Sequence, residues 1–270
     1  MAGPASQSHV SNKAKIARRV IEVLEYFDDA HPQATVMDIV RRFDRPQSST
    51  SELLSSLVEL GILRKDHAAR TYHPTPRAAL IGTAGQPRFV RDGRIVRLID
   101  ALIERTGYSV ALTAMVGLDS QIVHWRHAPL AMASTRELAS GMKDPVQQSA
   151  AGLLMLSTFQ KPRREGMLRR LNSEAPDHRK FHVPDLLAEI EAAADRRYVV
   201  GQVGFDTNAC GFSALMPRQP DGRPMAVSLV FAKEELVNSA AMLQAISETM
   251  REFLPDECQT GHIEMMHWAA

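Results

Sequence analysis

Residues 35–74 decide the fold of the N-terminal half and read TVMDIVRRFDRPQSSTSELLSSLVELGILRKDHAARTYHP. Thr35 stands three residues before Asp38, a spacing at which the two side chains can cap the start of a helix. We therefore predict a short helix that ends at Asp44-Arg45-Pro46. Its buried positions are Val36, Ile39, Val40 and Phe43.

A third helix is predicted after a very short turn. Pro46 suits the start of a helix, and Ser49 and Glu52 have the spacing of a second capping box. Gly61 is placed to adopt the left-handed conformation that closes a helix. The predicted buried stripe is Leu53, Leu54, Leu57 and Leu60.

The flanking sequence completes a winged helix-turn-helix. Upstream, apolar residues recur from Lys13 to Phe27 at helical spacing, and Pro32 ends that pattern. Downstream, residues 62–64 and 70–73 resemble two short strands joined by a turn. In such a module the third helix enters the major groove and the wing straddles the DNA backbone.

The third helix is expected to expose short polar side chains rather than Glu/Lys pairs. Hydroxyl and amide groups suit close approach to phosphates and base edges, which favours DNA binding over a three-helix bundle capped by a hairpin. Arg70 is expected at the hairpin tip, on phosphate. Glu52 repels phosphate if it points outward. The candidate DNA contacts are Arg45, Gln47, Ser48, Ser49, Thr50, Ser51, Ser55 and Arg70.

These residues resemble the DNA-binding domain of the IclR family of bacterial transcription factors. The matching stretches are ARRVIEVL at 17–24, RPQSSTSELL at 45–54, LGILRKD at 60–66 and RTYHPTPRA at 70–78. The family usually places a basic residue where Glu52 stands. Winged helices of other bacterial regulators, the MarR type for instance, share much of this pattern.

Composition agrees with a two-domain regulator. The chain has 270 residues, of which 44% are hydrophobic and 23% charged, enough for sizeable cores. Residues 1–107 hold 16 Lys/Arg against 12 Asp/Glu, and residues 108–270 hold 16 against 19. No apolar run approaches the length of a membrane span, and two cysteines favour a reducing cytoplasm. We expect a cytoplasmic protein without a membrane partner.

The C-terminal half alternates strand-like and helix-like segments. Predicted strands are 108–116, 121–126, 198–200, 211–216 and 225–231, and predicted helices are 149–159, 163–172, 185–197 and a last one with Leu236 on its apolar face. The fold class is α+β: an N-terminal winged helix-turn-helix, a connector helix and a C-terminal α/β domain with a mainly antiparallel sheet. The domain limits are a disordered tail at 1–12, the DNA-binding domain at 13–83, the connector at 84–107, the second domain at 108–256 and a tail at 257–270.

The second domain resembles the GAF-like effector-binding domain of the same family, through SAAG at 149–152, RYVV at 197–200 and FSALMP at 212–217. Family members repress or activate transcription as dimers or tetramers and respond to small metabolites, often carboxylates. The resemblance implies an effector site at Ser149, Ala150, Ala151, Ser213 and Ser228. Independently, a helix start offers N–H groups to an anion, and small residues leave room for it. Close helix–sheet packing also favours small residues.

Other chemistry is weakly supported by the sequence. His124-x-x-His127 and His178-x-x-x-His182 have spacings that metals use but lack convincing further ligands. No Ser/His/acid constellation or dinucleotide fingerprint stands out. We expect no metal, no cofactor and no enzymatic activity. The interpretation is a ligand-responsive regulator that binds a palindromic double-stranded operator, a small organic acid and copies of itself. The alternative is a sensor or enzyme domain whose N-terminal module binds a protein.

Overall fold

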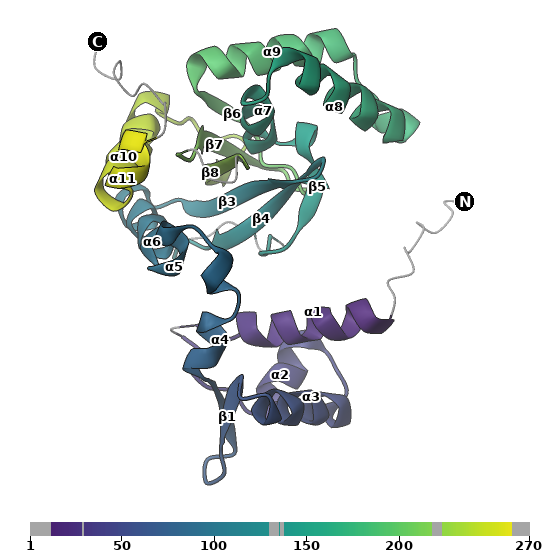
Figure 1. Cartoon of the computed structure of the whole chain (residues 1–270), viewed down its shortest axis with the longest axis vertical. Helices are drawn as coiled ribbons and strands as arrows, with labels where there is room; N and C mark the ends of the chain where they lie inside the picture. Colours follow the sequence, from purple (N-terminus) through teal and green to yellow (C-terminus); the bar gives the residue numbers. More distant parts are fainter. Residues whose placement is uncertain (1–11, 29, 130–134, 136–137, 218–222, 261–270) are drawn as a thin grey trace. The chain divides into compact units, whose positions relative to one another are not determined.

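The computed structural model describes residues 12–28, 30–129, 135, 138–217 and 223–260. The chain divides into two compact units, Met1–Gln86 and Pro87–Ala270, which we call the N-terminal and C-terminal units (Figure 1). Within the described part of the chain, no helix has the length and apolar character needed to cross a membrane.

The N-terminal unit is a winged helix-turn-helix, as predicted. Its elements are α1 (Asn12–Glu25), α2 (Val36–Phe43), α3 (Gln47–Glu59), β1 (Leu63–Asp66), β2 (Thr71–Pro74), α4 (Pro76–Leu80) and the 3-10 turn η1 (Thr83–Gly85). The strands β1 and β2 form an antiparallel hairpin, and Ala34 adds a bridge to Tyr72 beside it. Val23, Ile39, Leu54, Leu57, Leu63 and Tyr72 form its buried core.

One of the two predicted capping boxes is present. The backbone N–H of Asp38 donates to Thr35 Oγ1 at 3.2 Å, and the backbone N–H of Thr35 donates to Asp38 Oδ2 at 2.8 Å. The second box is wrong, because α3 already begins at Gln47 after Pro46. Ser49 therefore lies inside the first turn, where its hydroxyl donates to the Pro46 carbonyl at 3.1 Å.

The end of α3 also differs from the prediction. Gly61 adopts the predicted left-handed conformation with φ of 68°. Leu60 was expected in the buried stripe but is 59% exposed. It is the C-cap of α3, where the chain leaves the helix. The helical spacing that buries Leu54 and Leu57 therefore no longer applies to Leu60.

The C-terminal unit is built on one six-stranded sheet in the order β5-β4-β3-β8-β7-β6, and every pairing is antiparallel. The strands are β3 (Ser109–Val116), β4 (Asp119–Arg126), β5 (Lys143–Pro145), β6 (Tyr198–Gln202), β7 (Ala209–Leu215) and β8 (Met225–Ala232). The three-residue β5 was not predicted, because a segment this short carries no alternation of apolar and polar residues.

Helices cover both faces of this sheet. They are α5 (Arg88–Arg91), α6 (Arg94–Thr106), α7 (Ala150–Ser157), α8 (Lys161–Glu174), α9 (Val183–Arg196), α10 (Ser239–Phe253) and α11 (Pro255–Thr260), with 3-10 turns η3 (Val146–Gln148) and η4 (Asp177–Arg179). Figure 1 shows α7 to α9 on one side and α6 with α10 on the other. The predicted connector residues thus form α5 and α6, and α6 packs on the sheet.

Strand pleating assigns side chains to the two faces. Leu112, Phe212 and Leu229 pack toward α6 and α10. Their chain neighbours Ala111, Ser213 and Ser228 therefore face α7. At these positions of the central strands, large apolar side chains line one face of the sheet, and small residues with buried hydroxyls line the other.

Two predictions at the C-terminal end are corrected. Leu236 was expected on the last long helix but precedes it and is 99% exposed, since Asn238 caps α10 by accepting a hydrogen bond from the N–H of Ala241. The tail expected from residue 257 begins as helix, because α11 runs from Pro255 to Thr260. Glu257 there binds Arg94 at the start of α6. Residues 1–11 and 261–270 lie outside the described residues.

Candidate DNA-binding surface and effector site

The exposed face of α3 carries short polar side chains. Gln47, Ser48 and Ser55 are exposed, whereas Ser49 and Ser51 are partly buried. The Ser55 hydroxyl donates to the carbonyl of Ser51 at 2.9 Å. A hydroxyl oriented in this way keeps its lone pairs for an incoming donor such as a base amino group.

Thr50 does not lie on this exposed face, so the prediction for it is wrong. Its exposed fraction is 3%, and its hydroxyl donates to the Pro46 carbonyl at 3.0 Å. Thr50, Leu54 and Leu57 follow one another at helical spacing and form the buried side of α3. The run of hydroxyl residues in the sequence hides this periodicity, because serine and threonine look alike as polar positions.

Two charged residues near the start of α3 shape the potential DNA contacts. Arg45 donates a hydrogen bond to Glu22 of α1, and each side chain is 25% exposed. Glu52 is exposed and does not serve in a cap at Ser49. Arg45 is therefore partly neutralised within its own unit, and Glu52 adds a negative charge to the exposed surface of α3.

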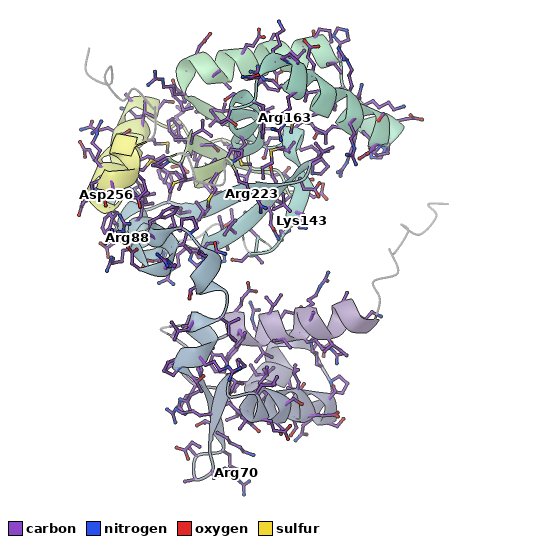
Figure 2. The ribbon with its side chains drawn as sticks, in the orientation of Figure 1. Arg70, Arg88, Lys143, Arg163, Arg223 and Asp256 are labelled. Carbon is purple, nitrogen blue, oxygen red and sulfur yellow. The ribbon has the colours of Figure 1, made fainter. Side chains whose placement is uncertain are left out.

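The wing presents Arg70 in its turn. Arg70 is exposed and has a φ of 55° (Figure 2 shows it at the tip). The Asp66 carboxylate accepts hydrogen bonds from the N–H groups of Ala69 and Ala68 at 3.0 and 2.9 Å. These bonds hold the pKa of Asp66 below its usual range and fix the shape of the turn. The expectation that Arg70 lies at the hairpin tip is confirmed, while its contact with phosphate stays a prediction.

Sequence reasoning did not single out Arg64 and Lys65 as DNA contacts. Both are exposed on β1, and Lys65 Nζ lies 5.4 Å from the centre of the Tyr72 ring. The available signal was a pair of basic residues in the first strand of a wing. These cations extend the positive surface along the hairpin toward Arg70.

The candidate effector residues at 149–151 begin α7. Ser149 is the N-cap, and its Oγ accepts from the N–H of Gly152 at 3.0 Å and lies 3.4 Å from Ser120 Oγ. The side chain of Ala150 packs in a cluster with Leu154 and Val199. Ala151 belongs to a second cluster on the same side of the sheet. The small side chains at this helix start are therefore closely packed.

The two serines of the sheet meet directly. Ser213 and Ser228 are cross-strand neighbours whose hydroxyl oxygens are 2.7 Å apart, and both are buried. They share the α7-facing side of the sheet. Near the same side, a Cβ added to Gly201 would lie 3.7 Å from the Cβ of Ala150. The structure thus brings the α7 start and the serine pair to one layer of the domain.

Asp144 of β5 is a candidate that the sequence analysis missed. It is 7% exposed, and its Oδ2 accepts a hydrogen bond from the N–H of Phe205 at 2.9 Å. Burial raises the pKa of the Asp144 carboxyl, and the nearby carboxylates of Asp206 and Asp119 raise it further. The hydrogen bond from the N–H of Phe205 acts in the opposite direction and lowers this pKa. No sequence motif predicts that Asp144 is buried, because its surroundings come from a strand and a loop that are far apart in the sequence.

Two of the four histidines with metal-like spacing, His127 and His182, have other partners. Trp125 Nε1 donates to His127 Nε2 at 2.9 Å, and His182 lies 3.0 Å from Asp185. Burial lowers the pKa of His127 and of His124. Among the residues that the structure describes, no group of three or more His, Cys, Asp or Glu side chains is arranged to hold a metal ion.

Comparison with known proteins agrees with this geometry. Residues 17–67 match the model of the IclR helix-turn-helix domain. No curated protein sequence matches the chain.

The solved structures that resemble the chain include the following three. An IclR homologue from Microbacterium hydrocarbonoxydans, solved in complex with 4-hydroxybenzoate, is 18% identical, with 91% of this chain and 100% of that chain covered and a TM-score of 0.56. The IclR of Thermotoga maritima is 15% identical, with 91% of this chain and 98% of that chain covered and a TM-score of 0.56. An IclR transcriptional regulator from Alicyclobacillus acidocaldarius is 14% identical, with 88% of this chain and 97% of that chain covered and a TM-score of 0.54. At these identities the likeness concerns the fold.

A winged helix-turn-helix unit followed by a unit built on an antiparallel sheet is the fold that the chain shares with these solved structures. The family model identifies the first domain, and the solved structures share the complete fold. Residues 17–67 therefore match the IclR helix-turn-helix domain, and the likeness of the rest of the chain to IclR regulators is one of fold.

Proposed function

We propose that the protein is a ligand-responsive regulator. Its N-terminal unit binds a palindromic operator as a dimer or tetramer in the cytoplasm, and a small organic anion bound by its C-terminal unit changes the affinity for DNA. The observation that carries the DNA-binding part is the combination of an exposed polar α3 face with a cationic wing. A palindromic operator follows from symmetry, because a two-fold dimer presents two equal recognition helices to two half-sites.

In this proposal, the exposed face of α3 contacts base edges and the wing contacts phosphates. Gln47, Ser48 and Ser55 are the exposed residues suited to base edges, with Ser49 and Ser51 at the margin. Arg70, together with Arg64 and Lys65, would neutralise phosphates. Thr50 has no part in this proposal.

Salt dependence tests the DNA-binding part. The full chain should bind a duplex from its own promoter region, and the affinity should fall steeply as salt rises, because phosphate neutralisation releases counterions. Arg70→Ala should bind more weakly, while Arg170→Ala, which removes a cation paired with Glu174 in α8, should bind as the wild type does. Absence of DNA binding at low salt would favour the alternative, an N-terminal module that binds a protein.

The effector is proposed to lie between the start of α7 and the Ser213–Ser228 pair. The first N–H groups of a helix have no partner within it, and the Ser149 hydroxyl already takes that of Gly152. The N–H groups of Ala150 and Ala151 are then the ones available to a carboxylate, with a gain of about 0.3–2 kcal/mol from the helix end. The homologue from M. hydrocarbonoxydans binds 4-hydroxybenzoate, an aromatic carboxylate, which supports this ligand class.

Paired ligands test the effector part. Thermal unfolding should be shifted by a carboxylate such as 4-hydroxybenzoate or benzoate and much less by the corresponding neutral amide. Equal shifts within every pair of a carboxylate panel would contradict an anion site. The comparison needs no knowledge of the operator.

A further inference from the structure

The segment 203–206, between β6 and β7, covers part of the sheet face that carries Ser213 and Ser228. A Cβ added to Gly211 would lie 3.1 Å from Val203 Cγ2 and 3.6 Å from Ser228 Cβ, so Val203 and Ser228 both border Gly211. Val203 and Phe205 are buried in one cluster, whose sheet members are Ala111, Ile122, Trp125, Ala209 and Val230. The segment therefore covers the sheet next to the buried serine pair.

Ser228 is surrounded by this cluster on its own strand and the next one. Ala111 is its cross-strand partner on β3, and Val230 is the next residue of β8 on the same face. Both are members of the cluster that contains Phe205. A ligand that reaches the Ser228 hydroxyl from this side has to displace Val203 and Phe205.

The same segment reaches the start of α7. A Cβ added to Gly204 would lie 2.9 Å from Asp144 Oδ2, 3.2 Å from Ser149 Cβ and 3.4 Å from the Gln148 carbonyl oxygen. Gly204 therefore rests against the residues that precede and cap α7. Its φ of 87° also requires glycine.

Two polar contacts fasten the segment to the residues before α7. The N–H of Phe205 donates to Asp144 Oδ2 at 2.9 Å. Arg179 binds Asp206 at 3.0 Å and also donates to Gln148 Oε1 at 3.4 Å. Both contacts join the turn after β6 to residues 144–148, which directly precede the N-cap of α7.

The backbone of this segment is held in an uncommon conformation. Phe205 and Asp206 have φ of 57° and 55°, directly after Gly204. A bulky residue at positive φ is a genuine outlier, which persists only where the surroundings enforce it. The turn's own hydrogen bonds, from the Thr207 N–H at 3.2 Å and the Thr207 hydroxyl at 2.9 Å to the Gly204 carbonyl, hold this conformation, and the contacts of Asp144 and Arg179 fix the turn to its surroundings.

We propose that Val203–Asp206 is a strap that closes the effector site and that Asp144 is its main fastener. The strap opens to admit the ligand and exposes the Ser213–Ser228 pair. This inference rests on the proposed function, since it regulates the same site. It assigns Asp144 a positioning role, because its carboxylate acts through the backbone of Phe205.

Thiol labelling tests the strap without any ligand. Cys210 and Cys258 are both partly buried, and they are replaced by alanine to give a background without other thiols. Ser228→Cys then reports access to the α7-facing side of β8. Val227→Cys reports the opposite side of the same strand, where Val227 is fully buried against α6 and α10.

Loss of the fastener should open only one face of the sheet. In the Asp144→Ala variant, the thiol at position 228 should react about tenfold faster, the scale of one lost hydrogen bond to a charged group. The thiol at position 227 should react at its original rate. Asp119→Ala removes another carboxylate near Asp144 and should leave both rates unchanged.

Two further variants separate strap opening from general loosening. Gly204→Ala should also accelerate labelling at position 228, because its methyl group has no space beside Asp144. Asp144→Asn keeps an oxygen for the Phe205 N–H and should label slowly. Unchanged labelling at position 228 in both Asp144→Ala and Gly204→Ala would overturn the strap, and so would equal acceleration at positions 227 and 228. The labelling experiment can confirm the strap even if no carboxylate shifts the thermal unfolding of the protein. That combination of results would contradict the proposed effector and leave the strap in place.

Discussion

Glu22 of α1 holds the guanidinium of Arg45, the residue just before the proline that starts α3. Both side chains are partly buried, so the ion pair lies where solvent screens it only in part. Arg45 was predicted as a DNA contact from its position in the turn. While Glu22 accepts its hydrogen bond, Arg45 has fewer N–H groups and less net charge to offer to a phosphate.

Removal of the Glu22 charge should therefore strengthen DNA binding. We expect Glu22→Gln to raise affinity for a random duplex by roughly 2–5-fold at low salt and to steepen the dependence on log salt by up to about one unit, the effect of one additional neutralised phosphate. Glu25→Gln is the matched control, since Glu25 is exposed on the same helix and loses the same charge. Equal effects of the two variants would mean that the affinity rises because of the change in net charge, and not because Arg45 is released from Glu22.

Arg70 should contribute affinity without sequence preference. Arg70→Ala should weaken binding to the operator and to random DNA alike and lower the salt slope by about one unit, because an arginine at the tip of the wing would contact phosphate. Titrations of both duplexes at several salt concentrations measure this. A change in sequence preference at constant slope would show instead that Arg70 reads bases.

The exposed and buried sides of α3 should respond differently to substitution. Gln47→Ala should reduce operator affinity by roughly 1–3 kcal/mol, the scale of one base contact. Thr50→Val changes the buried side and should affect the melting temperature of the N-terminal unit while leaving operator affinity intact. Gel-shift titration with a helicity check distinguishes these results. An affinity loss in Thr50→Val, at unchanged stability, would contradict the orientation of α3.

Local sequence signals predicted the elements and one of the caps. The Thr35–Asp38 box and the left-handed Gly61 follow from residue types at fixed spacing, which need no tertiary information. The start of α3 was misjudged because both Pro46 and Ser49 can begin a helix, and sequence alone does not rank them. The burial of Thr50 was missed for a related reason, since the polarity of threonine outweighed its position in the apolar period.

The C-terminal unit shows where prediction from sequence ends. Ser213 and Ser228 were chosen from the family resemblance, and their contact depends on the pairing of β7 with β8. Asp144 and Phe205 are far apart in the chain, and the bond between them requires β5 and a turn with positive φ. Neither the Ser213–Ser228 contact nor the Asp144–Phe205 hydrogen bond produces a periodic pattern in the sequence. Both become visible only once the strands are paired in the sheet.

The buried carboxyl of Asp144 predicts an unusual pH dependence. Burial raises its pKa in the folded protein. The stability linked to this group is therefore fully present below the ordinary carboxyl pKa of about 3.9 and is lost as pH rises through the raised folded value. Asp144→Asn has the same shape without the charge. It should stabilise the C-terminal unit at pH 7, with a difference that closes as pH falls toward about 4.

Asp38 provides the opposite case as a control. Hydrogen bonds from Thr35 lower the pKa of Asp38, so its contribution is present above the ordinary carboxyl pKa and is lost as pH falls through the lowered value. Asp38→Asn should therefore destabilise the N-terminal unit at pH 7. Denaturant titrations between pH 3 and pH 7 compare the two variants. A destabilised Asp144→Asn at pH 7 would show that its carboxylate is stabilised by more than the bond from Phe205.

The position of the effector is tested at Ala151. Because Ala151 is buried at the start of α7, a glutamate there would both fill the space and place a negative charge beside the helix N–H groups. Ala151→Glu and Ala151→Gln have nearly the same size, and each should destabilise the C-terminal unit by about 1–3 kcal/mol through overpacking. Only the glutamate repels an anion, so carboxylates that stabilise the wild type should lose more affinity for Ala151→Glu than for Ala151→Gln. Operator binding without ligand should persist in both variants. A wild-type response of Ala151→Glu to these carboxylates, measured by thermal unfolding, would place the anion away from α7.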